Sequence, residues 1–505
     1  MSGRGVIAGV GSSTSSSSQS PPPPPTANTS LPPWPGVTPP VSENYPTRAD
    51  YEATEELRHF IENRAPPESS HGMLKRYEVL VEIERMVNKW IYDVSAGEIQ
   101  SKARVLTFGS FRLGVITPMS DIDTLVLLPN SISRDDFFTD FVETMLNRSP
   151  HVTECNPVPA AHVPIIKVKY RGICMDILAA CVPTHVLSGD VDSVQEELIY
   201  DVEKRCMKSM NGIRVADKML SLVVDTQTFR LATRVIKYWA QQRLIYSNAI
   251  GYMGGVSWAV MVGRVCQLYP NYSAKQIVER FFFVYARWQW TATRDYGNSN
   301  VPLRRYTSDR HHVMPVITPI FPTHNTTYNV QESNKRVIVR EIKRGREIME
   351  LMSMNKSSGA TKGNEVTWAD LCAPFPFFQV YRQFLLLEIS AETEKAFLKF
   401  KGLVESRIRV LVKNLETCCG HKVLPQPHPV MFPRGPLGAD AIPGEAPTFL
   451  GAFVLGITFD HIATDDLAAS AEVSKEIKTA CDGFAEHITQ AALSDEWDSF
   501  RGQFK

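Results

Sequence analysis

Three aspartates have the residue type and spacing that most directly indicate chemistry in this sequence. Asp121 and Asp123 form a D-I-D triplet that opens an apolar run, so a strand would turn both carboxylates to one face. Asp176 is the one charged residue in an otherwise apolar run from Ile173 to Val182, and burying a lone charge is costly. A neighbouring strand that places Asp176 beside the pair would resolve this cost through shared Mg²⁺, which prefers oxygen ligands.

A glycine and a serine stand between an expected strand and these aspartates. Gly109 and Ser110 follow the β-rich run Val105–Phe108. A glycine lets the backbone approach a triphosphate closely, and the serine hydroxyl and backbone N–H groups can bind phosphate oxygens. Each motif alone is more often a plain turn or a solvated acidic pair, but the combination predicts nucleotidyl transfer with two metal ions. One ion would activate an attacking 3′ hydroxyl, and both would neutralise charge on the phosphate.

The segment after Gln227 predicts an amphipathic helix with a basic face. Arg230, Arg234 and Lys237 recur at helical steps, opposite a face that contains Phe229 and Trp239. One interpretation is a solvated basic face. The other is a cationic wall opposite the metals, in which Lys237 binds a phosphate.

A glycine-rich segment, Gly251–Trp258, follows and opens another apolar helix. Paired glycines before a helix can let a base or phosphate come close. Tight helix packing explains the same glycines equally well.

The hydrophobic periodicity predicts an α+β protein with several domains. A length of 505 residues suggests about three of them. Helical periodicity covers Tyr51–Val94 and Leu222–Tyr285, and Ser353–Asn364 is the best linker. We also expect strands at Val105–Phe108, Thr124–Leu128, Ile165–Val168, Ile173–Leu178 and Phe449–Phe459. A helical stretch near Gly402–Glu416 and a proline-rich loop from Pro425 to Pro447 are expected as well.

Composition limits the class of protein. Lys+Arg and Asp+Glu both number 54, so the whole chain has no net charge and any nucleic-acid-binding surface must be local. The nine cysteines contain no C-x-x-C pair, which favours reduced thiols over a zinc site or a disulfide framework. No membrane span is expected, because the best apolar stretch, Ala249–Gly263, is short of the roughly 20 residues needed.

Several longer segments closely resemble the eukaryotic, nuclear-type poly(A) polymerase family, within the DNA polymerase beta-like nucleotidyltransferase superfamily. The two most discriminating are I-Y-S-N-x-x-G-x-x-G-G-V-S-W at Ile245–Trp258 and S-D-R-H-H-x-M-P-V-I-T-P at Ser308–Pro319. The others include F-G-S-F-R-L-G-V-x-T at Phe108–Thr117, R-x-x-x-x-N-G-x-R-V at Arg205–Val215, I-K-x-W-A at Ile236–Ala240 and G-L-V-E-S-R-I-R at Gly402–Arg409.

This resemblance implies a specific domain organisation. We expect a disordered Ser/Pro-rich tail at residues 1–35 and a palm-like, mixed-sheet nucleotidyltransferase domain with N-terminal helices at 36–200. A helical central domain would occupy residues 201–352. A C-terminal α/β domain similar to an RNA-recognition module would occupy residues 353–505.

The resemblance also implies a reaction and a set of contacts. ATP and an RNA 3′ hydroxyl would give RNA longer by one AMP, with pyrophosphate, in polyadenylation of mRNA 3′ ends. Asp121, Asp123 and Asp176 would bind two Mg²⁺ ions, with Mn²⁺ as an alternative. The positions that match nucleotide contacts are Phe108, Gly109, Ser110, Thr117, Val163, Asn211, Lys237, Tyr246, Asn248, Gly255 and Val256. A nuclear monomer that works with mRNA 3′-end processing factors is expected.

Two alternatives differ in their consequences. A terminal uridylyltransferase of the same superfamily would prefer UTP, although such enzymes usually lack the Ser308–Pro319 type of segment and this C-terminal domain. An RNA-binding subunit with an inactive polymerase fold is disfavoured, because all three aspartates are present.

Overall fold

The computed structural model describes residues 38–159, 163–188, 191–194, 197–290, 312–358, 365–420, 422–434, 449–459 and 467–492. The predicted tail at 1–35 lies outside these ranges. So does the part of the Ser308–Pro319 segment that precedes residue 312.

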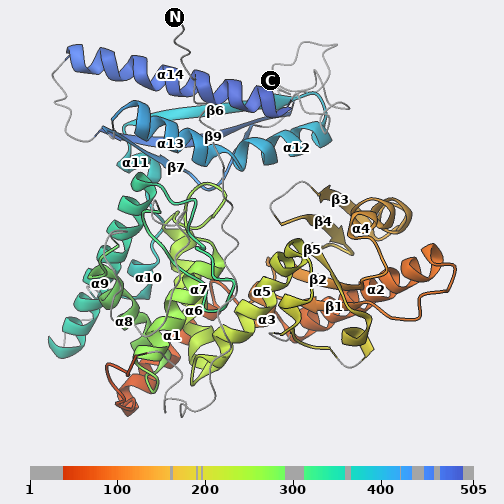
Figure 1. The fold of residues 1–505 in the computed structure, drawn as a ribbon. Helices are drawn as coiled ribbons and strands as arrows, with labels where there is room; N and C mark the ends of the chain where they lie inside the picture. Colours follow the sequence, from red (N-terminus) through yellow and green to blue (C-terminus); the bar gives the residue numbers. More distant parts are fainter. Residues whose placement is uncertain are drawn as a thin grey trace, which may run out of the picture. The chain divides into compact units, whose positions relative to one another are not determined.

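A five-stranded mixed sheet carries the aspartates (Figure 1). The strands are β1 (Arg104–Thr107), β2 (Ile122–Pro129), β3 (Val152–Val158), β4 (Ile165–Tyr170) and β5 (Ile173–Val182), in the order β1-β2-β5-β4-β3. Only β2 and β5 pair in parallel, and the other three pairs are antiparallel. The predicted mixed sheet and its four predicted strands are confirmed. Sequence reasoning missed β3, an edge strand that contains Pro157 and is largely exposed, because it lacks a buried apolar alternation.

Helices cover both faces of this sheet. On one face, α2 (Ser70–Val94) shares a core with the strands, α4 (Arg134–Phe138) and the π-helical turn Val142–Leu146. On the other face, α5 (Lys204–Ser221) packs against β5, near the short 3₁₀ turns Thr184–Ser188 and Glu197–Tyr200. Alternate residues of β2 point to the two faces: Ile122 and Val126 to the α2 side, and Leu125 and Leu127 to the α5 side.

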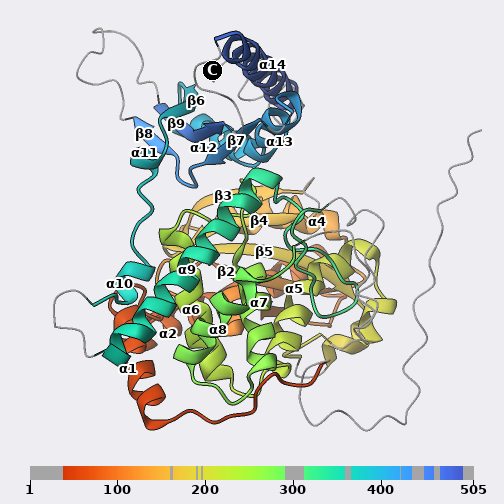
Figure 2. The same cartoon turned by 90° about the vertical axis from the view of Figure 1, so that its left-hand side faces the viewer.

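A helical region follows. Its helices are α6 (Thr226–Gln242), α7 (Gly255–Leu268), α8 (Ala274–Ala286) and α9 (Glu332–Ser358), and Figure 2 shows α9 beside α8, with α10 (Trp368–Leu371) next to it. Fully buried aromatic side chains fill its core: Trp239, Trp258, Phe281 and Phe282. The N-terminal helix α1 (Arg48–Glu62) contacts α6 and α8 and so belongs structurally with this region.

One predicted linker is partly helical. Helix α9 continues to Ser358 and therefore includes the first part of the expected linker Ser353–Asn364. The rest of that segment, residues 359–364, lies outside the described ranges. The predicted domain boundaries themselves remain predictions.

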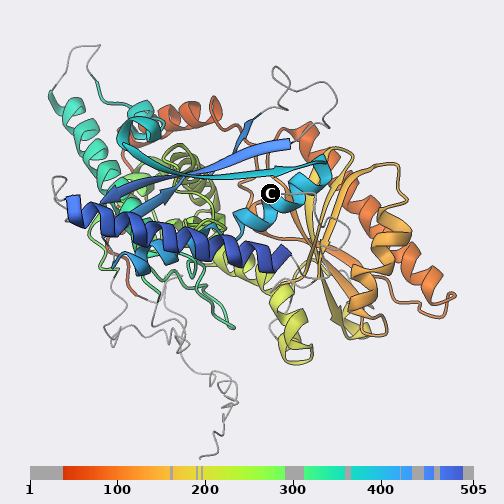
Figure 3. The ribbon, with the colours of Figure 1, turned by 90° about the horizontal axis from the view of Figure 1, so that it is seen from above.

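The C-terminal region is an α/β unit with an antiparallel sheet. The strands are β6 (Gln383–Ala391), β7 (Val423–Pro427), β8 (Phe432–Arg434) and β9 (Phe449–Phe459); the helices are α11 (Phe377–Val380), α12 (Glu394–Glu405), α13 (Ile408–Cys418) and α14 (Leu467–Ala492). Strand β9 pairs with β6, β7 and β8. Helices α12 and α13 pack on this sheet, and α14 lies against α13 and runs alongside the strands in Figure 3.

Two predictions for this region have different outcomes. The helical stretch expected near Gly402–Glu416 is confirmed and consists of parts of two helices, with a break at Ser406 and Arg407. The prediction of a proline-rich loop from residue 425 is wrong in part, because this segment contains part of β7 and all of β8. Pro425 is compatible with β7 because this strand lies at the edge of the sheet, where one side of the backbone needs no ladder partner.

Two expectations from composition can be compared with the structure. All nine cysteines lie within the described ranges and carry free thiols. In the part of the chain that the structure describes, every helix is too short or too polar to span a lipid bilayer.

Candidate active site

The strand register brings two of the three aspartates side by side. Asp123 of β2 is the direct neighbour of Asp176 on the parallel strand β5. Both residues lie on the α5 side of the sheet, because they alternate with Ile122 and Ile177, which face the α2 side. Asp121 precedes β2 by one residue and is exposed. The structure therefore gathers the predicted triad at the start of two adjacent strands.

The charges of this triad interact strongly. Burial raises the pKa of Asp123 from 3.8 to about 7, and the Asp121 and Asp176 carboxylates add to that rise. Burial also raises the pKa of Asp176, although the Lys167 ammonium, 4.0 Å from its Oδ2 atom on β4, offsets part of this effect. A carboxyl group with a pKa near neutrality is one for which a nearby cation would be strongly favourable.

The donor set fits a divalent cation, but the side chains are not closed around one. Among the described residues, no three or more His, Cys, Asp or Glu side chains are already spaced to hold a metal ion. Carboxylates repel one another when no cation lies between them. The three side chains offer only carboxylate oxygens, which are the ligands that Mg²⁺ prefers. Their role as metal ligands remains a prediction.

Gly109 lies directly against Asp123. It opens the short helix α3 (Gly109–Leu113) with a φ of +59°, a conformation that favours glycine. A Cβ atom at this position would lie 1.9 Å from Asp123 Oδ2. The backbone N–H of Ser110 donates to the same carboxylate. The predicted turn is therefore built around Asp123 and has no room for a side chain.

Helix α6 places one lysine beside the carboxylates. Burial lowers the pKa of Lys237, and the nearby Asp121 and Asp123 charges oppose that fall. The interpretation of a solvated basic face is wrong for this helix. Arg234 is only 9% exposed, and Arg230 Nε donates to the Leu113 carbonyl at 3.0 Å.

Tyr246 joins this lysine to the glycine-rich segment. The Lys237 ammonium lies 5.9 Å from the centre of the Tyr246 ring. Burial raises the pKa of Tyr246 to about 12, and the Asp121 and Asp123 charges contribute. A Cβ atom on Gly255, the first residue of α7, would lie 2.8 Å from the tyrosine hydroxyl.

The remaining residues of this segment lie close by. A Cβ atom on Gly254 would lie 3.4 Å from that of Asn248, and Val256 is 40% exposed. The paired glycines therefore allow Tyr246 and Asn248 to approach the start of α7.

Helix α5 holds the residues next to Phe108. A Cβ atom on Gly212 would lie 2.7 Å from the Phe108 ring. The adjacent Asn211 is 7% exposed, and its Nδ2 atom lies 3.1 Å from His324 Nδ1. Val163 packs against the same apolar cluster as Phe108. Thr117 is set apart from this group, since its hydroxyl lies 3.0 Å from the Ser120 hydroxyl, in the turn that leads to Asp121.

Sequence reasoning missed two residues of this site. Lys167 could have been found from alternation, because I-I-K-V-K-Y in β4 puts its lysines on the face opposite Ile166 and Val168. His324, which also lies 3.3 Å from the Thr318 hydroxyl, carries no such signal. Its position beside Asn211 depends on a contact between distant parts of the chain.

Comparison with known families assigns three consecutive segments. Residues 36–223 match the model of the poly(A) polymerase nucleotidyltransferase domain, and residues 228–362 match the poly(A) polymerase central domain. Residues 376–434 match the poly(A) polymerase predicted RNA binding domain. The carboxylates, Gly109 and Asn211 lie in the first segment, whereas Lys237, Tyr246 and Gly255 lie in the second.

Individual relatives agree with these matches. Poly(A) polymerase PAPa of Candida albicans is 38% identical over 416 residues, which cover 79% of this chain and 73% of that protein. Poly(A) polymerase PAPalpha of the same organism is 37% identical over 404 residues, covering 77% and 71%. Nuclear poly(A) polymerase 1 of Arabidopsis thaliana is 38% identical over 396 residues, covering 75% and 54%. The chain thus spans about half the length of the Arabidopsis relatives that it matches.

Solved structures offer a weaker likeness. A cytoplasmic RNA terminal U-transferase has a TM-score of 0.45 and 16% identity, over 65% of this chain and 99% of that chain. A likeness of this size gives no guide to the nucleotide.

The first prediction concerns the charge of Asp123. Its pKa is about 7 in the folded protein and ordinarily 3.8, so folding favours the protonated carboxyl group. That contribution is complete below about pH 4 and is lost as the pH rises through about 7. In chelator at about pH 8, Asp123→Asn should therefore melt a few degrees above the unchanged protein. The difference should shrink as the pH falls to about 5.

Thermal melts across this pH range, with and without Mg²⁺, provide the measurement. Added Mg²⁺ should raise the melting temperature of the unchanged protein more than that of the variant. Equal melting temperatures at every pH would contradict the carboxylate cluster.

The second prediction concerns the space at Gly109. Gly109→Ala should lower turnover by roughly 10²-fold or more, because the new methyl group must displace the Asp123 carboxylate. Gly172→Ala is the matched control: Gly172 has a φ of +80° and no atom within 4 Å of an added Cβ. Both variants should lose about 1 to 2 kcal/mol of unfolding free energy through backbone strain. Equal turnover in the two would show that the clash is harmless.

Proposed function

The chain belongs to the poly(A) polymerase family, and from that premise we propose that it adds AMP from ATP to RNA 3′ ends without a template. The reaction joins the RNA 3′ oxygen to the α-phosphorus of ATP and releases pyrophosphate. The relatives that carry the name poly(A) polymerase support this choice of nucleotide and acceptor.

One structural observation carries the proposal. Asp123 and Asp176 are neighbours on parallel strands, and the Asp121 charge acts on both. A structural role does not account for three mutually repelling carboxylates, two of which are half-buried. A site for divalent cations accounts for them, because the cations remove the repulsion.

Asp121, Asp123 and Asp176 are the residues that would hold two divalent cations. Bound there, Mg²⁺ would act as a Lewis acid that eases deprotonation of the 3′ hydroxyl and neutralises charge on the phosphates, with Mn²⁺ as an alternative ion.

The protein's own groups would bind and orient the triphosphate. Gly109 packs directly against the Asp123 carboxylate, so a phosphate held beside this carboxylate would meet backbone there and no side chain. The Ser110 hydroxyl is the adjacent donor. The ammonium of Lys237, held near the carboxylates by α6, would neutralise phosphate charge from the opposite side.

A second group of residues would form the nucleoside end of the site. Tyr246 is a buried, neutral phenol, since its pKa is about 12, and it can donate a hydrogen bond or stack on a base. The Asn211 Oδ1 atom is buried and has no hydrogen-bond partner within the described residues. The same holds for the Asn248 Oδ1 atom. A nucleotide that donates to these oxygens would satisfy both. Phe108, Thr117, Val163, Gly255 and Val256 complete the proposed contacts.

Partners and location follow from the relatives. The Arabidopsis relatives are named nuclear poly(A) polymerases, which supports action in the nucleus, on mRNA 3′ ends and beside other processing factors. The match of residues 376–434 to a predicted RNA binding domain supports RNA contact by the C-terminal region. We propose that the protein acts as a monomer.

The third prediction tests the nucleotide. A labelled RNA primer incubated with Mg²⁺ and each of the four nucleotides separately should be extended most efficiently with ATP. Asp123→Ala should lower extension by several orders of magnitude while leaving the protein folded, because it removes a ligand and no core side chain. Preference for UTP would favour the uridylyltransferase alternative. Extension that survives Asp123→Ala would contradict the metal assignment.

The fourth prediction concerns Lys237. Lys237→Ala should raise the KM for ATP and lower kcat/KM by roughly 10²-fold, because a cation beside the triphosphate is lost. Its melting temperature should change little, since the cost of burying the ammonium offsets its attraction to the Asp121 and Asp123 carboxylates. Lys218→Ala, on an exposed position of α5, is the control and should behave as the unchanged protein. Equal kinetics of the two variants would remove Lys237 from the site.

A further inference from the structure

A buried ion pair stands behind the turn that leads to Asp121. Arg76 of α2 and Glu68, just before the helix, have side chains that are 5% and 7% exposed, and Arg76 Nε donates to Glu68 Oε2 at 2.8 Å. Taking both charges out of water is costly, and an apolar pair of similar volume is often as stable. Stability alone therefore does not account for this pair.

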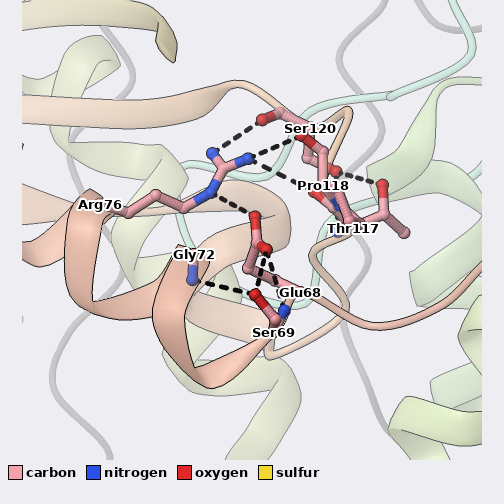
Figure 4. Close-up of polar contacts among 7 residues, drawn as sticks. All are labelled: Glu68, Ser69, Gly72, Arg76, Thr117, Pro118 and Ser120. Atoms are coloured by element: carbon pink, nitrogen blue, oxygen red, sulfur yellow. Dashed lines mark hydrogen bonds and ion pairs between the residues drawn. The ribbon is translucent and has the colours of Figure 1, made fainter. Parts of the chain in front are cut away.

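The same guanidinium also donates hydrogen bonds to three backbone carbonyls of this turn, as Figure 4 shows. Arg76 Nη1 donates to the Ser120 carbonyl at 2.8 Å. Its Nη2 atom donates to the carbonyls of Pro118 at 3.1 Å and Thr117 at 3.5 Å. Only a planar, forked cation can reach a carboxylate on one edge and these carbonyls on the other.

Glu68 anchors this arrangement to the helix and to the turn. Its carboxylate accepts from the Ser69 backbone N–H at 2.9 Å, and Ser69 is the N-cap of α2. The Glu68 backbone N–H donates to the Ile116 carbonyl at 3.1 Å. Hydrogen bonds from Arg76 and Ser69 outweigh the effect of burial, so the pKa of Glu68 is lowered and its carboxylate stays ionised.

Apart from this clamp, hydrogen bonds between Thr117 and Ser120 hold the turn. Ser120 N–H donates to the Thr117 carbonyl at 2.9 Å, and Thr117 N–H donates to the Ser120 hydroxyl at 3.1 Å. Asp121 comes next, exposed and outside the β2 ladder, whereas Asp123 is fixed by its strand. The direction of the Asp121 carboxylate therefore depends on the turn, and the turn depends on Arg76 together with the Thr117–Ser120 hydrogen bonds.

We propose that Arg76, anchored by Glu68, is a positioning residue that fixes the turn from Thr117 to Ser120 and so directs the Asp121 carboxylate toward the divalent cations. The proposal rests on the proposed function, because it assumes that Asp121 is a metal ligand. Contacts that orient a metal-binding side chain without touching the metal are typically worth about 10- to 100-fold in metal affinity or activity.

The fifth prediction uses Arg76→Lys, which keeps the charge opposite Glu68 but loses the fork. We expect kcat to fall by about 10- to 100-fold and the Mg²⁺ concentration for half-maximal rate to rise several-fold. The KM for ATP, measured at saturating Mg²⁺, should change little. Binding of Mn²⁺ alone, followed by the loss of the free Mn²⁺ EPR signal, should weaken by a similar factor.

Arg134→Lys is the matched control. Arg134 is also a buried arginine of the same region, and it donates to the Ala179 carbonyl and to the Ser209 hydroxyl, each at 3.0 Å. Its replacement should cost a comparable amount of stability, seen as a lower melting temperature, and should leave Mn²⁺ affinity unchanged. Equal Mn²⁺ affinity in Arg76→Lys and Arg134→Lys would overturn the proposal.

A second variant loosens the same turn and leaves the buried pair intact. Ser120→Ala removes the hydroxyl that holds Thr117, and it should weaken Mn²⁺ binding in the same direction as Arg76→Lys even where the latter does not fold. Unchanged Mn²⁺ binding in Ser120→Ala, with Arg76→Lys unfolded, would also overturn the proposal. If the unchanged protein binds Mn²⁺ but does not extend RNA, the proposed function fails and the positioning role stands on the binding data.

Discussion

The mutual repulsion of three carboxylates is the constraint on which the rest of this structure depends. Asp123 and Asp176 sit side by side on parallel strands, and Asp121 adds a third charge at the same end of the sheet. Burial and these like charges together bring the pKa of Asp123 to about 7. A fold gains nothing in stability from such a cluster. Our proposal accounts for the cluster, because bound divalent cations would supply the missing positive charge.

Several elements appear around this constraint in complementary roles. Gly109 has no side chain, so the turn before β2 can pack directly against Asp123. Lys237 supplies a fixed positive charge from α6, outside the sheet. The pair of Arg76 and Glu68 holds the turn before Asp121 from behind. The three elements therefore contribute differently: the glycine allows close packing, the lysine balances charge, and the ion pair orients the turn.

The proposed nucleotide site is shared between two segments of the chain. The carboxylates and Asn211 come from residues 36–223, and Lys237 and Tyr246 come from residues 228–362. The contact of Asn211 with His324 links the two segments directly. This division explains why the resemblance of the central segment to a known family indicates the substrate more specifically than the three aspartates do. In our proposal the aspartates supply the chemistry of nucleotidyl transfer, which is common to many nucleotidyltransferases, whereas other residues contact the nucleoside.

The sequence by itself determined the donor set, the strands that carry it and the family. Those strands could be predicted because alternation and apolar runs are local patterns, and alternation also indicates the face of Asp123. Asp121 lies just outside the strand, so its direction was not determined in this way. The tertiary structure alone decided which residues meet. The register of β2 on β5 places Asp123 beside Asp176. Packing of the central helices half-buries the basic side of the helix that contains Lys237. The clamp by Arg76 and the place of His324 were invisible in the sequence, because they depend on contacts between residues far apart in the chain, which no local periodicity encodes.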